Sequence, residues 1–252
     1  MKYFSIILLA SLALSCKPNT KSEGLSAGEI IDQSIEIAGG KTFENSVIRF
    51  NFRDKYYVAR RNTGNFSLIR MFESDGDSVF DLLSNSGFER FVNNTRAQLS
   101  DSLKTVYSAS VNSVHYFSVL PYGLNDSAVN KELLGEEQIK TKDYYKIKVT
   151  FNENGGGEDF EDVFIYWIDK QTFKVDYLAY SYNEADGMGM RFRVAYNERL
   201  VNGLRFVDYD NYKPKDSAAA LDSLGQAFNN NQLTLVSKIE LNAIEVELID
   251  LQ

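Results

Sequence analysis

The sequence predicts an α+β protein that is mainly antiparallel β, with helices packed on one face of a sheet. Two observations predict this class. Apolar and polar residues alternate at period two along most of the chain, and several predicted strands follow one another with only turns between them. The longest such stretch, residues 163–206, contains the only tryptophan and predicts three long antiparallel strands.

The first half of the chain predicts two helices and a run of strands. Ser26 and Glu29 form a capping box that begins a helix, and Gly39-Gly40 ends it. Apolar residues spaced three to five apart predict a second helix over residues 95–117. Alternation predicts strands at residues 48–52, 56–61, 65–73, 78–83, 88–93, 137–140 and 145–151.

The second half is predicted to be mostly strand. The end of the stretch 163–206 overlaps a further strand, expected at residues 204–212. A short helical segment is expected within residues 217–228. Residues 233–248 close the chain as one long or two short strands. The total is about ten or eleven strands, and no repeat of 20 to 50 residues predicts a solenoid or propeller.

Length and charge limit the class of protein. A chain of 252 residues fits one all-β domain, and 44% hydrophobic residues supply a core. The net charge of -8 disfavours nucleic acid as a partner, because a polyanion is repelled by the average field of the protein.

Residues 1–15 have the pattern of a secretory signal peptide, with Lys2 before an apolar run. The segment Leu12-Ala13-Leu14-Ser15-Cys16 resembles the lipobox of bacterial lipoproteins, which implies lipidation of Cys16 and a membrane contact through the acylated N-terminus. Residues 16–24 would be a tether and residues 25–252 a single domain. No acidic run follows Cys16, which favours a cell-envelope location at the periplasmic face of the outer membrane. The alternative is an ordinary secreted protein.

Short motifs in the second half carry a family resemblance. They are Trp167-Ile168-Asp169 with Thr172, and Val201-Asn202-Gly203. With the order of helices and strands, they resemble the half-barrel of the Lol-type lipoprotein carriers and their outer-membrane receptor. The chain is also similar to uncharacterised lipoproteins of Bacteroidota that carry a domain of unknown function. The resemblance implies a strongly curved half-barrel sheet with helices packed on its concave face, where acyl chains are held.

The resemblance makes a hydrophobic ligand, a lipid or a lipoprotein, the leading functional hypothesis. The candidate cavity-lining residues are Tyr177, Met188, Met190, Phe192 and Tyr196. Trp167 and Asp169 are expected to fix the end of a strand and the turn after it. Apolar residues at period two fit a filled core equally well, so an accessory or scaffold lipoprotein without a ligand is the alternative.

Catalytic and metal signals are weak. His115 is the only histidine and has no nucleophile motif beside it, so no catalytic residue is assigned and an envelope hydrolase is the third hypothesis. One histidine and one cysteine at the anchor do not supply a zinc site. No cofactor and no metal are therefore expected.

Overall fold

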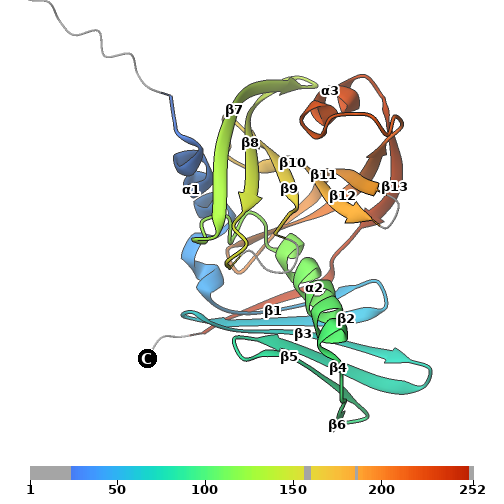
Figure 1. The fold of residues 1–252 in the computed structure, drawn as a ribbon. Helices are drawn as coiled ribbons and strands as arrows, with labels where there is room; N and C mark the ends of the chain where they lie inside the picture. Colours follow the sequence, from blue (N-terminus) through green and yellow to red (C-terminus); the bar gives the residue numbers. More distant parts are fainter. Residues whose placement is uncertain (1–23, 156–159, 185–186, 250–252) are drawn as a thin grey trace, which may run out of the picture.

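The protein folds into two antiparallel sheets with a helix between them (Figure 1). The computed structural model describes residues 24–155, 160–184 and 187–249. Within these ranges, each sheet has seven strands, so the strands number fourteen. The prediction of a mainly antiparallel β fold with packed helices is confirmed, with the strands divided between two curved sheets.

The first sheet has the strand order β14-β1-β2-β3-β4-β5-β6. Six of its strands, β1 to β6, form a meander of hairpins, and the last strand of the chain pairs with β1. Its strands are β1 (Asn45–Phe52), β2 (Lys55–Asn62), β3 (Asn65–Ser74), β4 (Asp77–Ser84), β5 (Gly87–Val92), β6 (Thr95–Arg96) and β14 (Asn242–Leu248).

The second sheet has the order β13-β12-β11-β10-β9-β8-β7, so each strand pairs with its neighbour in sequence. Its strands are β7 (Val129–Ile139), β8 (Lys142–Phe151), β9 (Val163–Asp169), β10 (Val175–Glu184), β11 (Gly187–Val201), β12 (Leu204–Pro214) and β13 (Leu233–Ile239).

The first helix confirms its predicted caps. In α1 (Ala27–Ala38) the Ser26 hydroxyl accepts from the Glu29 backbone N–H, and the Glu29 carboxylate accepts from the Ser26 backbone N–H at 2.8 Å. The helix ends at Gly39, whose φ of 129° only glycine adopts readily. A 3-10 turn, η1 (Gly40–Glu44), follows and leads into β1.

The second helix begins later than predicted. Ser100 caps α2 (Asp101–Ser118), and Thr95–Arg96 forms the short strand β6 instead. The prediction extended the helix because Leu99 falls on its apolar period, but a serine N-cap outweighs that period. The predicted strand at residues 137–140 is likewise the end of a longer strand, β7.

Helix α2 lies on the first sheet and has the second sheet on its other side (Figure 1). Val111 and His115 are buried against the first sheet, beside Phe50 and Tyr57. Tyr116 and Phe117 instead meet Phe164 of the second sheet. The helix therefore separates the two sheets and contributes side chains to both cores.

The second sheet is covered on both faces. Helix α1 packs on one face, through Ile30 and Ile31. On the other face, η2 (Leu221–Ser223) and α3 (Leu224–Asn229) cover Trp167 and Phe192. Helix α3 contacts both outermost strands, β7 and β13, so the sheet curves around it (Figure 1).

A polar joint connects the two sheets where β13 is followed by β14. These strands are separated only by residues 240–241, yet β13 belongs to the second sheet and β14 to the first. The buried carboxylate of Asp208 accepts hydrogen bonds from the Leu241 backbone N–H at 2.9 Å, from Arg199 at 2.7 Å and 3.0 Å, and from Asn197 at 2.6 Å. One carboxylate thus fixes the bend between the sheets.

Candidate functional site: a cleft between α2 and the second sheet

A cleft of about 720 Å³ lies between α2 and the second sheet. Its volume is within the range of roughly 300–1,000 Å³ that small-molecule sites occupy. Eight aromatic side chains from both sides line it, namely Phe52, Tyr116, Phe117, Phe151, Phe164, Tyr180, Tyr182 and Tyr209. The remaining lining residues are Asn112, Ser113, Val114, Ser118, Glu161, Asp162, Arg191, Arg193, Val207, Ile239 and Leu241.

The aromatic wall is held by ring contacts and by buried hydroxyl groups. Phe164 stacks on Tyr180, and Phe117 contacts both rings. The Tyr116 hydroxyl lies 3.2 Å from that of Tyr166, behind the wall. Burial raises the pKa of both tyrosines well above the usual value, so their hydroxyl groups stay protonated at physiological pH.

Arg193 of β11 places a positive charge in this wall. Its side chain packs over the Phe117 ring, with Cζ 3.8 Å from the ring centroid. Its Nη2 donates to the Tyr180 hydroxyl at 2.8 Å. The residue is only 7% exposed. The cleft therefore combines an apolar, aromatic wall with one buried guanidinium group.

The five residues predicted to line a cavity lie on the opposite face of β10 and β11 from this cleft. Phe192 is fully buried between Trp167 and Phe228, and Tyr177 stacks on Phe192. Met190 packs at the edge of the same cluster, and Met188 is 68% exposed. Around Phe192, helix α3 fills this face of the sheet where the prediction expected room for a ligand.

Two of the predicted residues, Tyr177 and Tyr196, line a second hollow of about 450 Å³. Its rim is polar: Lys142 bridges Asp169 and Asp176 at 3.1 Å to each. The Tyr196 hydroxyl donates to Glu240 at 2.8 Å. Because these charges pair with each other, this hollow offers an apolar ligand less than the larger cleft does.

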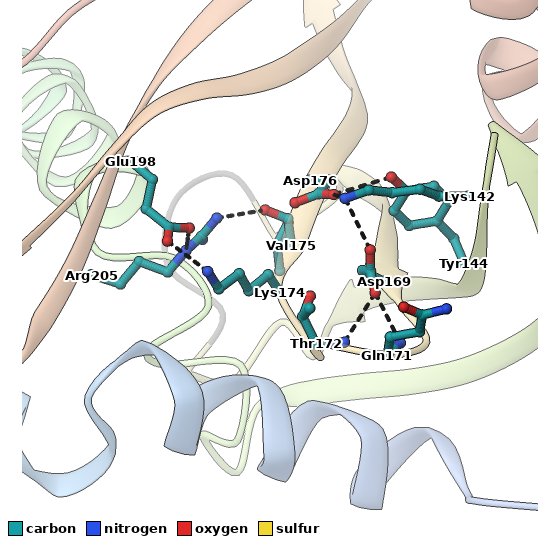
Figure 2. Close-up of polar contacts among 10 residues, drawn as sticks. All are labelled: Lys142, Tyr144, Asp169, Gln171, Thr172, Lys174, Val175, Asp176, Glu198 and Arg205. Atoms are coloured by element: carbon teal, nitrogen blue, oxygen red, sulfur yellow. Dashed lines mark hydrogen bonds and ion pairs between the residues drawn. The ribbon is translucent and has the colours of Figure 1, made fainter. Parts of the chain in front are cut away.

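Asp169 and Trp167 organise the end of β9, and Figure 2 shows the contacts of Asp169. The Asp169 carboxylate accepts from the backbone N–H groups of Gln171 at 2.8 Å and Thr172 at 2.9 Å, which closes the turn. Burial raises the pKa of Asp169, but the N–H groups of Thr172 and Gln171 together with Lys142 outweigh it, and the pKa lies below its usual value. Trp167 donates from Nε1 to Glu137 at 3.0 Å.

His115 lies outside the lining of both cavities. It is 1% exposed and its Nε2 donates to the Ile69 carbonyl at 3.0 Å, beneath α2. Burial lowers the pKa of His115 to about 3. In the part of the chain that the structure describes, no cluster of three metal-ligating side chains occurs and no helix is long and apolar enough to cross a membrane. The predicted lipidation site Cys16 lies outside the described residues.

Sequence reasoning missed Arg193 and its neighbour Arg191 as cleft residues. Both alternate along β11 with Met190 and Phe192, so they face the other way. Alternating arginine with apolar residues predicts a solvated face. The available signal was that β9 and β10 are apolar on both faces, which requires cover on both sides of the sheet.

Comparison with known proteins gives a family and a set of distant structures. The model of a family of unknown function, DUF6503, matches residues 2–241, and no curated protein matches the chain. A LolA superfamily protein from Nitrosomonas europaea is 14% identical, with 90% of this chain and 96% of that chain covered and a TM-score of 0.48. A DUF1329 family protein from Desulfovibrio piger is 12% identical, with 87% of this chain and 92% of that chain covered and a TM-score of 0.49. Lipoprotein LppX from Mycobacterium tuberculosis is 14% identical, with 61% of this chain and 86% of that chain covered and a TM-score of 0.28.

Proposed function

This chain belongs to DUF6503, a family of unknown function, so its function has to be inferred from its own structure. We propose that it is a non-catalytic cell-envelope lipoprotein that binds a hydrophobic ligand. The ligand, an acyl chain of a lipid or lipoprotein, would lie in the cleft between α2 and the second sheet. The observation that supports this proposal is the cleft itself, which joins a ligand-sized volume to eight aromatic side chains, with polar and charged groups among the other lining residues. The similar solved structures have TM-scores below 0.5, so the cleft and not their likeness supports the proposal.

The membrane contact in this proposal is lipidated Cys16. Residues 1–15 would be removed and residues 16–24 would tether the domain, at the periplasmic face of the outer membrane. Several acyl chains on one terminus would hold the protein firmly, because each buried methylene contributes roughly 0.8 kcal/mol. Radiolabelled palmitate should enter the wild-type protein in cells and should not enter the Cys16→Ser variant. Equal labelling of both would disprove the anchor.

Ligand binding is tested on a soluble form that starts after Cys16 and keeps every described residue. A fluorescent fatty acid should bind the wild type, and Ser113→Trp should weaken binding at least about tenfold, because the indole would occupy the cleft. Thr105→Trp is the matched control, since Thr105 is exposed on the same helix and does not line the cleft. Binding by the control should equal that of the wild type.

A specific observation also favours a second candidate, an accessory or scaffold lipoprotein without a ligand. The face of the second sheet that curves around α3 is filled by Phe228, Phe192 and Trp167. If the purified wild type contains no lipid by mass spectrometry and takes up no fluorescent fatty acid, the scaffold function replaces the ligand-binding one.

A further inference from the structure

Arg193 has hydrogen-bonding capacity in the cleft that the protein leaves unused. Its Nη2 donates to the Tyr180 hydroxyl, but its buried Nε has no hydrogen-bond partner. Among the described residues, no carboxylate lies within 4.0 Å of its guanidinium group. The side chain is 93% buried, so water compensates this charge poorly.

The other buried arginines of the described chain are paired. Arg70 and Asp81 are joined at 2.6 Å beneath α2. Arg205 of β12 pairs with Glu198 of β11 at 2.7 Å, within the second sheet (Figure 2). This is the expected arrangement, because a buried charge is costly without a partner. Arg193 lacks such a partner and lines the larger cleft. Arg61, which is partly buried, also has a guanidinium nitrogen without a hydrogen-bond partner, but it lines neither cavity.

Three aromatic rings surround the Arg193 guanidinium, and none of them accepts a hydrogen bond in place of an anion at its unpartnered Nε. Its Cζ lies 3.8 Å from the centroid of Phe117, 4.9 Å from that of Tyr180 and 5.9 Å from that of Tyr209. Cation–π contacts of this kind stabilise a guanidinium group that is removed from water. The N–H groups in the plane of a guanidinium match the oxygens of a carboxylate or a phosphate.

We propose that Arg193 binds the anionic head group of the ligand, and that the ligand is a single-chain acyl amphiphile with a carboxylate or phosphate head group. The acyl chain packs on the aromatic and aliphatic wall, which includes Phe151, Phe164 and Ile239. The anion supplies the partner that Arg193 lacks. This inference rests on the proposed function, since it assumes that an acyl chain enters the cleft.

The test compares head groups on one chain length, using the soluble form that starts after Cys16. A fatty acid, its methyl ester and a monoacyl phosphate of the same length are titrated against the wild type. The fatty acid or the monoacyl phosphate should bind on the order of 100-fold more tightly than the neutral ester, because a buried charge pair forms only with an anion. Whichever anion binds more tightly identifies the head group.

Variants assign this preference to Arg193. Arg193→Met should remove the preference for the anion while ester binding stays the same or improves, and Arg193→Lys should keep part of it. Arg205→Met is the matched control, because Arg205 is equally buried but is paired with Glu198 and does not line the larger cleft. Its acid-to-ester ratio should equal that of the wild type.

The outcomes separate this inference from the proposed function. If the wild type binds neither the anions nor the ester, the proposed function itself is wrong. If it binds acid, phosphate and ester equally, a hydrophobic ligand stands and the anionic head group is disproved. That comparison needs no variant, so it holds even where Arg193→Met fails to fold. An anion preference that survives in folded Arg193→Met would place the anion elsewhere.

Discussion

At the scale of single residues, two basic side chains lie buried on either side of α2, and they differ in how they tolerate burial. His115 becomes neutral, since burial lowers its pKa to about 3 from an ordinary value of 6.5. Arg193 instead packs its guanidinium group against the rings of Phe117 and Tyr180 in the cleft wall. The histidine therefore makes stability depend on pH. The arginine remains a buried group whose Nε has no hydrogen-bond partner in the protein.

The lowered pKa of His115 predicts a loss of stability in acid. As pH falls below 6.5 the unfolded chain binds a proton that the folded protein does not, so the contribution of His115 is complete above pH 6.5 and is lost between pH 6.5 and about 3. At a pH two units below 6.5 the loss is about 3 kcal/mol.

The measurement is urea unfolding of the wild type and of His115→Gln at neutral pH and in mild acid. Glutamine cannot titrate, and its amide replaces the donor to the Ile69 carbonyl. The stability advantage of the wild type should shrink by about 3 kcal/mol from pH 7.5 to pH 4.5. A difference that is constant over this range would show that His115 does not carry the pH dependence.

The candidate site shows which residue-level information a sequence holds. Alternation correctly grouped Met190 with Phe192, and it separated them from Arg191 and Arg193. It does not say which group meets the cleft, because both faces of the second sheet are covered. That choice depends on where α3 and α2 pack, and these contacts are long-range.

At the scale of elements, local signals placed most strands and helices. The first five strands and α1 were predicted within a few residues, because hairpin turns, period-two alternation and the capping box of Ser26 are all local. The division into two sheets was not predicted. It is set at residues 240–241, where one extended run changes sheets, and nothing local distinguishes that bend from a continuous strand.

Helix α3 depends on the absence of a side chain at Gly225. A Cβ there would lie 2.6 Å from Glu137 Oε1 and 3.0 Å from Trp167 Cζ2. Gly225→Ala should therefore destabilise the protein by about 1–3 kcal/mol, although alanine is the better helix former. Fluorescence of Trp167, the only tryptophan, should shift to the red as α3 moves away from it.

The control for Gly225→Ala is Gln226→Ala on the same helix. Gln226 is exposed, so its truncation should change neither stability by more than about 0.5 kcal/mol nor the tryptophan emission. A Gly225→Ala protein as stable as this control would show that Glu137 and Trp167 move aside without cost.

At the scale of the whole molecule, Asp208 connects the sheets. Its carboxylate binds Arg199 and the backbone of Leu241, and it is 2% exposed. Asp208→Ala should cost about 3 kcal/mol, because it leaves a partly buried arginine and a buried N–H without their acceptor. Amide hydrogen exchange should then rise first in β14, which would lose its attachment to the second sheet.

Glu247→Ala is the matched control on β14. Glu247 pairs with Arg49 at 3.0 Å, but its side chain is 64% exposed, so its loss should cost less than about 1 kcal/mol. If Asp208→Ala is no more destabilising than this exposed pair, or if β14 exchanges no faster, the joint at Asp208 does not couple the sheets.

The pairing of β14 with β1 also determines when the molecule can be completed. Ser46 of β1 pairs with Leu248 of β14, which is synthesised about two hundred residues later, so this pairing cannot form until the chain is nearly complete. Until then β1 has an open edge, and Ile239 and Leu241 are missing from the cleft wall. An unfinished chain can therefore form hairpins early but cannot complete the wall of the cleft. The open edge of β1 favours aggregation until β14 pairs with it.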